Sequence, residues 1–219
     1  MKNTYYNGWI LFLVLCFVNA LLAFSFNYLF VSDILYYQTY GEQLALSRID
    51  KMLELSKKWE WLGYVFIPII LFIRVVFTSL CLYIGIFFVQ IDLKFSKLFK
   101  IALLAEFVYV LSGITKLVVF IFFKELSTLN DLQFIPFSLL NIFDKNAIDP
   151  LFVHPLGMLN IFNLVYFLVL AWLLKDLINE EKEKPTQNFG GALKLVVTSY
   201  GSGLLLWVVL GMFLTLNLS

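Results

Sequence analysis

The chain has 219 residues, of which 61% are hydrophobic and only 14% are charged. Soluble domains are about half apolar and about a quarter charged, so this composition favours lipid as the solvent for most side chains. The formal net charge of +1 argues against a nucleic-acid partner held by a basic field. Cys16 and Cys81 both lie in apolar segments, where thiols behave as small hydrophobes, and they predict neither a disulfide nor a redox compartment.

Five apolar segments are long enough to cross a bilayer. A helix that spans roughly 30 Å of hydrocarbon needs about 20 residues. Backbone groups in lipid must be bonded within their own segment, so each segment is expected to be a helix. The predicted fold class is therefore all-α, a polytopic membrane helix bundle that forms one integral membrane domain over residues 1–219. The predicted spans are residues 9–31, 61–89, 101–123, 156–174 and 193–214.

One or two amphipathic helices are expected at the membrane interface in addition to the spans. The connection 32–60 has charged residues on one helical face and apolar residues on the other, namely Leu46, Ile49, Leu53 and Trp59. This pattern predicts an interfacial helix or a solvated helix that caps the bundle. The apolar stretch 134–143 is too short to span, and it predicts an interfacial, re-entrant or bundle-packed piece.

Lysine and arginine residues indicate the orientation, because cytoplasmic loops carry an excess of them. With the N-terminus inside, the cytoplasmic parts hold Lys2, Lys94, Lys97, Lys100, Lys175, Lys182, Lys184 and Lys194. The outside parts hold Arg48, Lys51, Lys57, Lys58, Lys124 and Lys145. The bias of eight to six favours a cytoplasmic N-terminus and an outside C-terminus.

Arg74, Glu106 and Lys116 are charges inside predicted spans. A charge at the membrane centre costs at least ~2.5–3.5 kcal/mol on insertion scales, so it normally faces protein or water. The similar expected depth of Arg74 and Glu106 predicts an ion pair that fixes the register of two helices, with Lys116 reaching toward the headgroups. The alternative is a proton or ion relay through all three residues as one buried polar cluster. Tyr109 and Ser112 could complete either arrangement.

His154 is the single histidine and stands at the start of the fourth predicted span. It predicts an interfacial or pH-sensitive group. No Cys/His cluster at ligand spacing accompanies it, so no metal site and no cofactor is predicted. Ser202 lies between glycines, as in intramembrane serine proteases. However, Tyr200 stands where those enzymes have glycine, and His154 precedes the serine instead of following it. No catalytic residue is therefore predicted.

Ser199, Gly203 and Gly211 follow one another at spacings of four and eight residues in the last predicted span. Small residues at such spacing let neighbouring helices approach closely in membranes. We therefore expect these three residues to mediate helix packing.

Residues 134–214 carry a pair of motifs that resembles the C-terminal half of Yip1-domain membrane proteins. The matching residues are Pro136, Ser138 and Leu139 in a "PxSL" element, then Asn160 and Phe162 in an "N-x-F" core, with Trp172 after it. The family has five spans with a cytoplasmic N-terminus and an outside C-terminus, in agreement with the count and orientation above. The short region before the first span is similar to that of bacterial members, so a bacterial inner membrane is the expected location.

The resemblance implies a non-catalytic membrane protein that organises or partners other membrane proteins. Its expected partners are the lipid bilayer and either another membrane protein or a second copy of this chain. The first alternative is a subunit of a transporter or export complex that uses Arg74, Glu106 and Lys116 as a polar path. The second alternative is an intramembrane enzyme.

Overall fold

A computed structural model describes residues 7–143, 148–181 and 187–218 of the chain. Throughout these ranges the regular structure is helical, and five helices are long and apolar enough to cross a membrane. The prediction of an all-α polytopic bundle is therefore confirmed. Lys2, Lys145, Lys182 and Lys184, which enter the orientation argument, lie outside the described residues.

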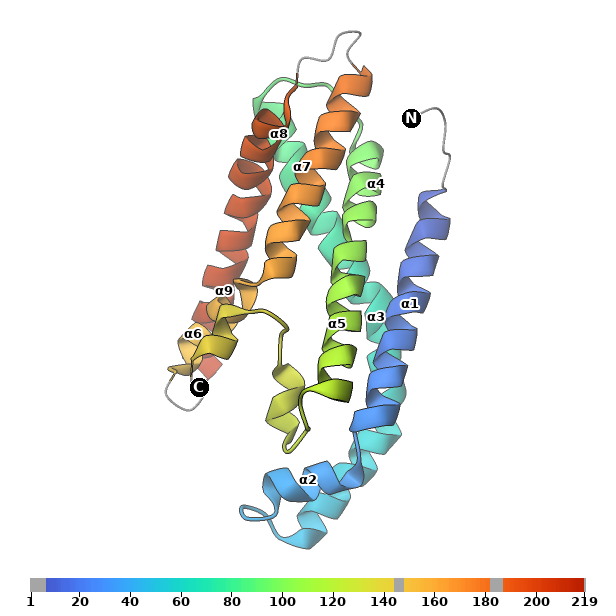
Figure 1. Ribbon diagram of the computed structural model, residues 1–219, viewed down its shortest axis with the longest axis vertical. Helices are drawn as coiled ribbons and strands as arrows, with labels where there is room; N and C mark the ends of the chain where they lie inside the picture. The colour runs from blue at the N-terminus through green and yellow to red at the C-terminus, as the bar shows by residue number, and fades with distance from the viewer. Residues whose placement is uncertain (1–6, 144–147, 182–186, 219) are drawn as a thin grey trace.

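The five spanning elements run alternately along the long axis of the bundle, so that α1 begins at one end and α9 finishes at the other (Figure 1). They are α1 (Gly8–Phe30), α3 (Leu46–Phe88), α4 with α5 (Phe95–Ala105 and Phe107–Phe122), α7 (Ile161–Glu181), and α8, η3 and α9 (Phe189–Val196, Val197–Gly201 and Ser202–Leu218). The shorter elements are α2 (Asp33–Tyr40), η1 (Leu129–Gln133), η2 (Leu139–Ile142) and α6 (Pro150–Met158).

Helix α3 is a single helix of 43 residues, which corresponds to about 65 Å and is roughly twice the thickness of the hydrocarbon core. The sequence interpretation divided this stretch into an amphipathic connection and a separate span, and that division is wrong. No glycine or proline occurs between residues 46 and 60, so nothing stops the helix, and each added residue contributes one more backbone hydrogen bond.

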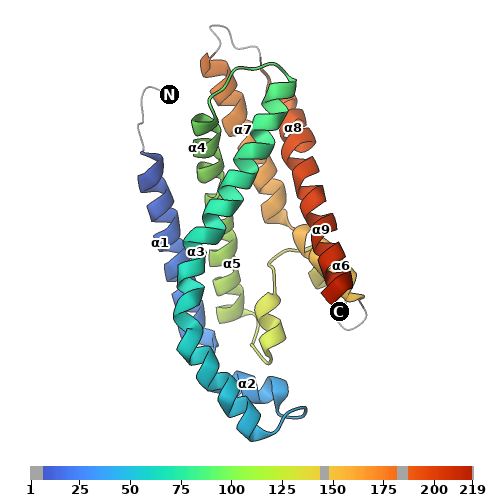
Figure 2. The same ribbon diagram turned by 180° about the vertical axis from the view of Figure 1, so that it is seen from behind.

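The amphipathic face of this extension is covered by α2, which lies across it at one end of the bundle (Figure 2). Leu35 of α2 and Ile49 and Leu53 of α3 are buried, whereas Leu46 and Trp59 stay exposed. Side-chain hydrogen bonds also join α2 to α3 around this apolar interface. They are Tyr36–Ser56 at 2.7 Å, Tyr37–Asp50 at 2.5 Å and Lys57–Asp33 at 2.7 Å. Exposed ion pairs contribute about 0–1 kcal/mol, so apolar packing accounts for most of this docking.

The third and fourth spans begin at other residues than predicted. Helix α4 starts at Phe95, so Lys97 and Lys100 belong to the helix and not to the connection before it. The fourth span starts at Ile161, because Asn160 ends the apolar run that begins at Leu156. The side chain of Asn160 donates to the Gly157 carbonyl at 3.0 Å and accepts from the Asn163 N–H at 2.9 Å, which breaks the chain into α6 and α7.

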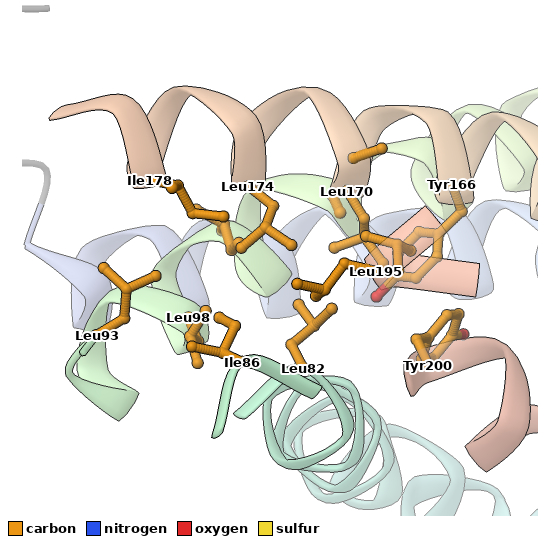
Figure 3. Packing of buried hydrophobic residues seen from close by; sticks show 14 of the residues in the cluster. Leu82, Ile86, Leu93, Leu98, Tyr166, Leu170, Leu174, Ile178, Leu195 and Tyr200 are labelled. Carbon is orange, nitrogen blue, oxygen red and sulfur yellow. The ribbon is translucent and has the colours of Figure 1, made fainter. Parts of the chain in front are cut away.

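The larger apolar core fills the half of the bundle where α3 ends and α4 begins (Figure 3). Its fully buried residues include Leu82 and Ile86 of α3, Leu98 of α4, and Leu170 and Leu174 of α7. Lipid tails are as apolar as leucine, so within the membrane these residues stabilise the bundle by close packing and not by leaving water. The candidate site lies at the edge of this core, where Tyr166 and Tyr200 belong to it, and a cavity extends from there into the other half of the bundle.

Candidate functional site

Arg74 of α3 and Glu106, the residue between α4 and α5, form a buried ion pair. Arg74 Nε donates to Glu106 Oε1 at 3.0 Å, and Arg74 Nη2 donates to Oε2. The Glu106 side chain is fully buried, whereas that of Arg74 is 36% exposed. Two parallel N–H···O bonds fix both the distance and the plane of the carboxylate. The structure therefore brings together the two charges that the sequence pairs.

Tyrosines of two further elements enclose the ion pair. The Arg74 guanidinium lies 4.4 Å from the centroid of the Tyr109 ring, where the electron-rich face attracts a cation. The hydroxyl of Tyr166 donates to Glu106 Oε1 at 3.4 Å and lies 3.1 Å from Thr78 Oγ1. Tyr166 belongs to α7 and is completely buried, so the network joins α3, α5 and α7 at one depth.

The network continues to the break between α6 and α7 through Asn163. Tyr109 donates to Asn163 Oδ1 at 2.8 Å, and Asn163 Nδ2 donates to the Met158 carbonyl at 2.5 Å. Sequence reasoning did not single out Asn163 or Tyr166. An amide inside an apolar span was a usable signal for Asn163, because intramembrane polar groups need partners. Tyr166 carried no such signal, because tyrosine is common in membrane helices.

A π-helical turn, η3, places Tyr200 against the same network. The Tyr200 ring centroid lies 5.5 Å from that of Tyr166 and 5.1 Å from that of Phe167. Tyr166 and Tyr200 are seen close to each other at one end of the apolar core in Figure 3. Single π turns inside helices are found frequently at functional sites. The π-helical turn η3 and the junction of α4 and α5 at Glu106 therefore both lie next to Tyr166.

A cavity of about 1510 Å³ lies next to the ion pair, in the half of the bundle where α5 and α9 end. Its polar wall includes Arg74, Tyr109, Ser112, Asn163 and Tyr200, and its charged groups farther along are Lys124 and Asp131. Pockets for drug-sized ligands measure about 300–1,000 Å³, so this cavity has room for a larger molecule.

Lys116 lies away from the ion pair. Its Nζ donates to the Leu132 carbonyl of η1 at 2.6 Å and lies 4.9 Å from the centroid of the Phe26 ring. Ten residues of helix separate it from Glu106, which corresponds to about 15 Å. Lys116 therefore contacts the segment after α5, in contrast to the alternative in which all three residues form one buried polar cluster.

His154 and Ser202 are not placed as a base and its nucleophile. The Ser202 hydroxyl donates to the Thr198 carbonyl at 2.7 Å. The His154 ring, on α6, lies against Gly211, where an added Cβ would meet it at 3.4 Å. Gly211 is nine residues beyond Ser202, about 13 Å along the helix, whereas a nucleophile and its base must be within hydrogen-bond reach. His154 lines the cavity instead.

Small residues of the last span lie where it meets its neighbours. An added Cβ at Gly85 of α3 would overlap Ser199, and one at Gly203 would overlap Cys81 Sγ. At Gly211 an added Cβ would make only an ordinary contact of 3.4 Å with His154. Ser199 and Gly203 thus permit the close approach of this span to α3, whereas the space at Gly211 does not require a glycine.

Asp131 stabilises η1 at the end of the cavity where α5 ends. Its Oδ2 accepts from the Thr128 N–H at 3.1 Å, and its Oδ1 lies 3.3 Å from Lys124 Nζ. Partial burial alone would raise the pKa of Asp131. The Thr128 N–H and the Lys124 ammonium outweigh this effect and hold the pKa below its ordinary value. The stabilisation is therefore present above the unfolded pKa of about 3.9 and is lost as pH falls through the folded pKa.

We expect the protection of the η1 amides against hydrogen exchange, corrected for intrinsic rates, to fall as pH drops below about 4. Asp131→Asn should flatten this profile, because its amide does not titrate. Asp131→Ala, which also removes the acceptor of the Thr128 N–H, should lower protection at neutral pH by about 0.5–2 kcal/mol. Asp149→Asn, which makes the same change at the residue whose Oδ1 accepts from the Leu151 N–H at the start of α6, is the matched control. An unchanged η1 profile in Asp131→Asn would show that Asp131 does not hold this turn.

The two segments that carry the Yip1-like motifs meet in the structure. Ser138 and Asn160 form an isolated antiparallel bridge, in which the Leu139 N–H donates to the Leu159 carbonyl at 2.9 Å. The Ile161 N–H donates to the Phe137 carbonyl at 3.3 Å. The buried Ser138 hydroxyl has no hydrogen-bond partner among the described residues.

Fold and site together define an all-α, multi-pass integral membrane protein with a largely apolar cavity that has the Arg74 guanidinium on its wall. Comparison with protein-family models, with curated proteins and with solved structures found no match. The likeness to Yip1-domain proteins therefore rests on the motif residues alone.

Proposed function

We propose that the protein acts by binding and not by catalysis, as the ligand-binding subunit of a membrane transport or export complex. The observation that carries the proposal is the cavity of about 1510 Å³ with the Arg74 guanidinium on its wall. Charged side chains at this depth are expensive and mark substrate pathways. The ion pair with Glu106 holds the guanidinium in place before a ligand arrives, so less conformational entropy is lost when the ligand binds.

The arrangement favours a binding site over a relay. A relay needs a sequence of titratable groups that leads from one membrane face to the other. Here the cavity lies on one side of Arg74, and the apolar core with Leu82, Ile86 and Leu98 lies on the other. Lys116, the third member of the relay interpretation, contacts the Leu132 carbonyl.

Filling the cavity tests the proposal. Ser112 of α5 lines the cavity, whereas its neighbour Leu111 is 56% exposed on the outer surface. We expect native mass spectrometry of protein extracted from membranes to find a bound small molecule in the wild type and in Leu111→Trp. Ser112→Trp should lose that molecule at unchanged thermal stability. Equal retention by both variants would place the molecule outside the cavity and remove the basis of the proposal.

A Yip1-like organiser of membrane proteins is the second candidate, and the pairing of Ser138 with Asn160 favours it. In this case the partner is another membrane protein or a second copy of the chain. Ser112→Trp separates the two candidates, because an organiser keeps its partner in a mild-detergent pull-down when the cavity is filled. A bacterial inner membrane with a cytoplasmic N-terminus is the proposed location for both candidates.

A further inference from the structure

The cavity is open sideways between α3 and α9. Ile70 and Ile73 of α3 and Trp207 of α9 line it, yet they are 58%, 55% and 48% exposed. The two helices approach each other where Phe77 meets Trp207, with ring centroids 6.1 Å apart. From there they diverge toward the end of the bundle where α9 finishes (Figure 2). The opening therefore faces the acyl chains of one leaflet.

The polar end of the cavity presents a cation. A guanidinium has five N–H donors, and the bonds to Glu106 use Nε and Nη2. Among the described residues no acceptor is bonded to Nη1, and Arg74 lines the cavity. Glu106 is fully enclosed and does not line it. A molecule in the cavity therefore meets the donors of Arg74 and not the carboxylate behind them.

A second cation, Lys124, lies at the end of the cavity where α5 finishes, and it is paired with Asp131 at 3.3 Å. The charges that line the cavity are thus the Lys124–Asp131 pair and Arg74, whose partner Glu106 lies behind it and outside the lining. Apolar side chains border the sideways opening, and the interior combines apolar side chains with polar groups, of which Arg74 is one. This layout matches a molecule with an anionic head and an apolar tail, and the volume exceeds that of a pocket for a drug-sized ligand.

We propose that the cavity takes the phosphate-bearing anionic headgroup of a membrane lipid from the leaflet on the side where α5 and α9 end. The phosphate oxygens accept from Arg74 Nη1, since a planar guanidinium is suited to phosphate. The acyl chains pass out between α3 and α9 and remain in the bilayer, so they are not transferred into the protein. This inference rests on the proposed function and names the class of its ligand.

The test uses the full chain in nanodiscs that contain lipid with brominated acyl chains, which quench nearby tryptophan fluorescence. The signal of Trp207 is obtained by subtracting the emission of Trp207→Phe. We expect brominated phosphatidylglycerol to quench Trp207 at about tenfold lower mole fraction than brominated phosphatidylcholine. Both lipids carry the phosphate, but choline adds a cation that the Arg74 guanidinium repels. Trp172 of α7 is 51% exposed and does not line the cavity, so it should be quenched equally by both lipids.

Two variants connect the preference to the cavity. Arg74→Gln combined with Glu106→Gln removes both charges at similar volume, and it should abolish the preference for phosphatidylglycerol. Ser112→Trp should abolish it by filling the space. Equal quenching of Trp207 by the two lipids in the wild type would overturn the proposal, and so would a preference that survives in both variants. Loss of the preference in millimolar inorganic phosphate would point to a soluble anion and would also overturn it.

Native mass spectrometry and Trp207 quenching together separate this inference from the function on which it rests. One possible result is that Ser112→Trp displaces a soluble molecule in mass spectrometry while Trp207 is quenched equally by both lipids. The binding function then stands and the lipid assignment fails. If nothing is displaced and no preference is found, both fail together.

Discussion

Arg74→Ala is expected to destabilise the folded protein by about 3–5 kcal/mol, because it leaves the buried carboxylate of Glu106 without its partner. The Glu106 side chain loses both hydrogen bonds from Arg74 and keeps only the Tyr166 hydroxyl as a donor. The measurement is the free energy of unfolding in mixed micelles titrated with a denaturing detergent. Ile73→Ala is the matched control, because Ile73 precedes Arg74 in α3 and its side chain is about half exposed. It should reduce the free energy of unfolding far less than Arg74→Ala.

The double variant Arg74→Gln with Glu106→Gln decides whether the two residues act as one unit. Replacing a buried ion pair by neutral groups of similar volume is often nearly neutral, so the double variant should be more stable than Arg74→Ala. A double-mutant cycle measures the coupling between the two positions. Strict additivity of the single changes would contradict the arrangement in which the Arg74 and Glu106 side chains depend on each other.

Gly85→Ala is expected to destabilise the protein by about 1–3 kcal/mol through overpacking. An added Cβ would overlap the Cβ of Ser199, an atom fixed to the backbone, so α3 and η3 would have to move apart. This cost opposes the gain of about 1 kcal/mol that alanine brings to a helix interior. The same unfolding measurement applies.

Gly63→Ala is the matched control, because Gly63 lies on the same helix and an added Cβ there has no neighbour within 4 Å. It should be neutral or stabilising. Ser199→Gly in the Gly85→Ala background should recover part of the loss by removing the overlapping Cβ. Equal effects of the two alanine variants would mean that α3 and η3 are not in close contact at Gly85.

The number of spans and the ion pair were both predictable, each from a single strong physical constraint. Five apolar runs of bilayer length leave no alternative to helices. A charge at the centre of a span requires a partner, and Glu106 was the available group of opposite sign at the depth of Arg74. The role of Lys116 was not predictable in this way, because its acceptor is a backbone carbonyl, Leu132, and a carbonyl leaves no mark in the sequence.

Boundaries and the cavity depend on contacts that composition does not record. The run from Leu156 reads as one span, but the side chains of Asn160 and Asn163 bond to nearby backbone and separate α6 from α7. The continuity of α3 through Trp61 is fixed by the absence of a helix breaker and by the docking of α2. The cavity arises because α3 and α9 diverge beyond Phe77, and no local pattern encodes the angle between two distant helices.

The ion pair also has a consequence for biosynthesis. Arg74 and Glu106 are 32 residues apart and belong to consecutive spans, so the ribosome completes the acidic partner about 2–6 s after the basic one at 5–20 residues per second. During that interval α3 alone would carry an uncompensated charge into lipid. We therefore expect α3 and the α4–α5 segment to leave the insertion machinery together as a hairpin.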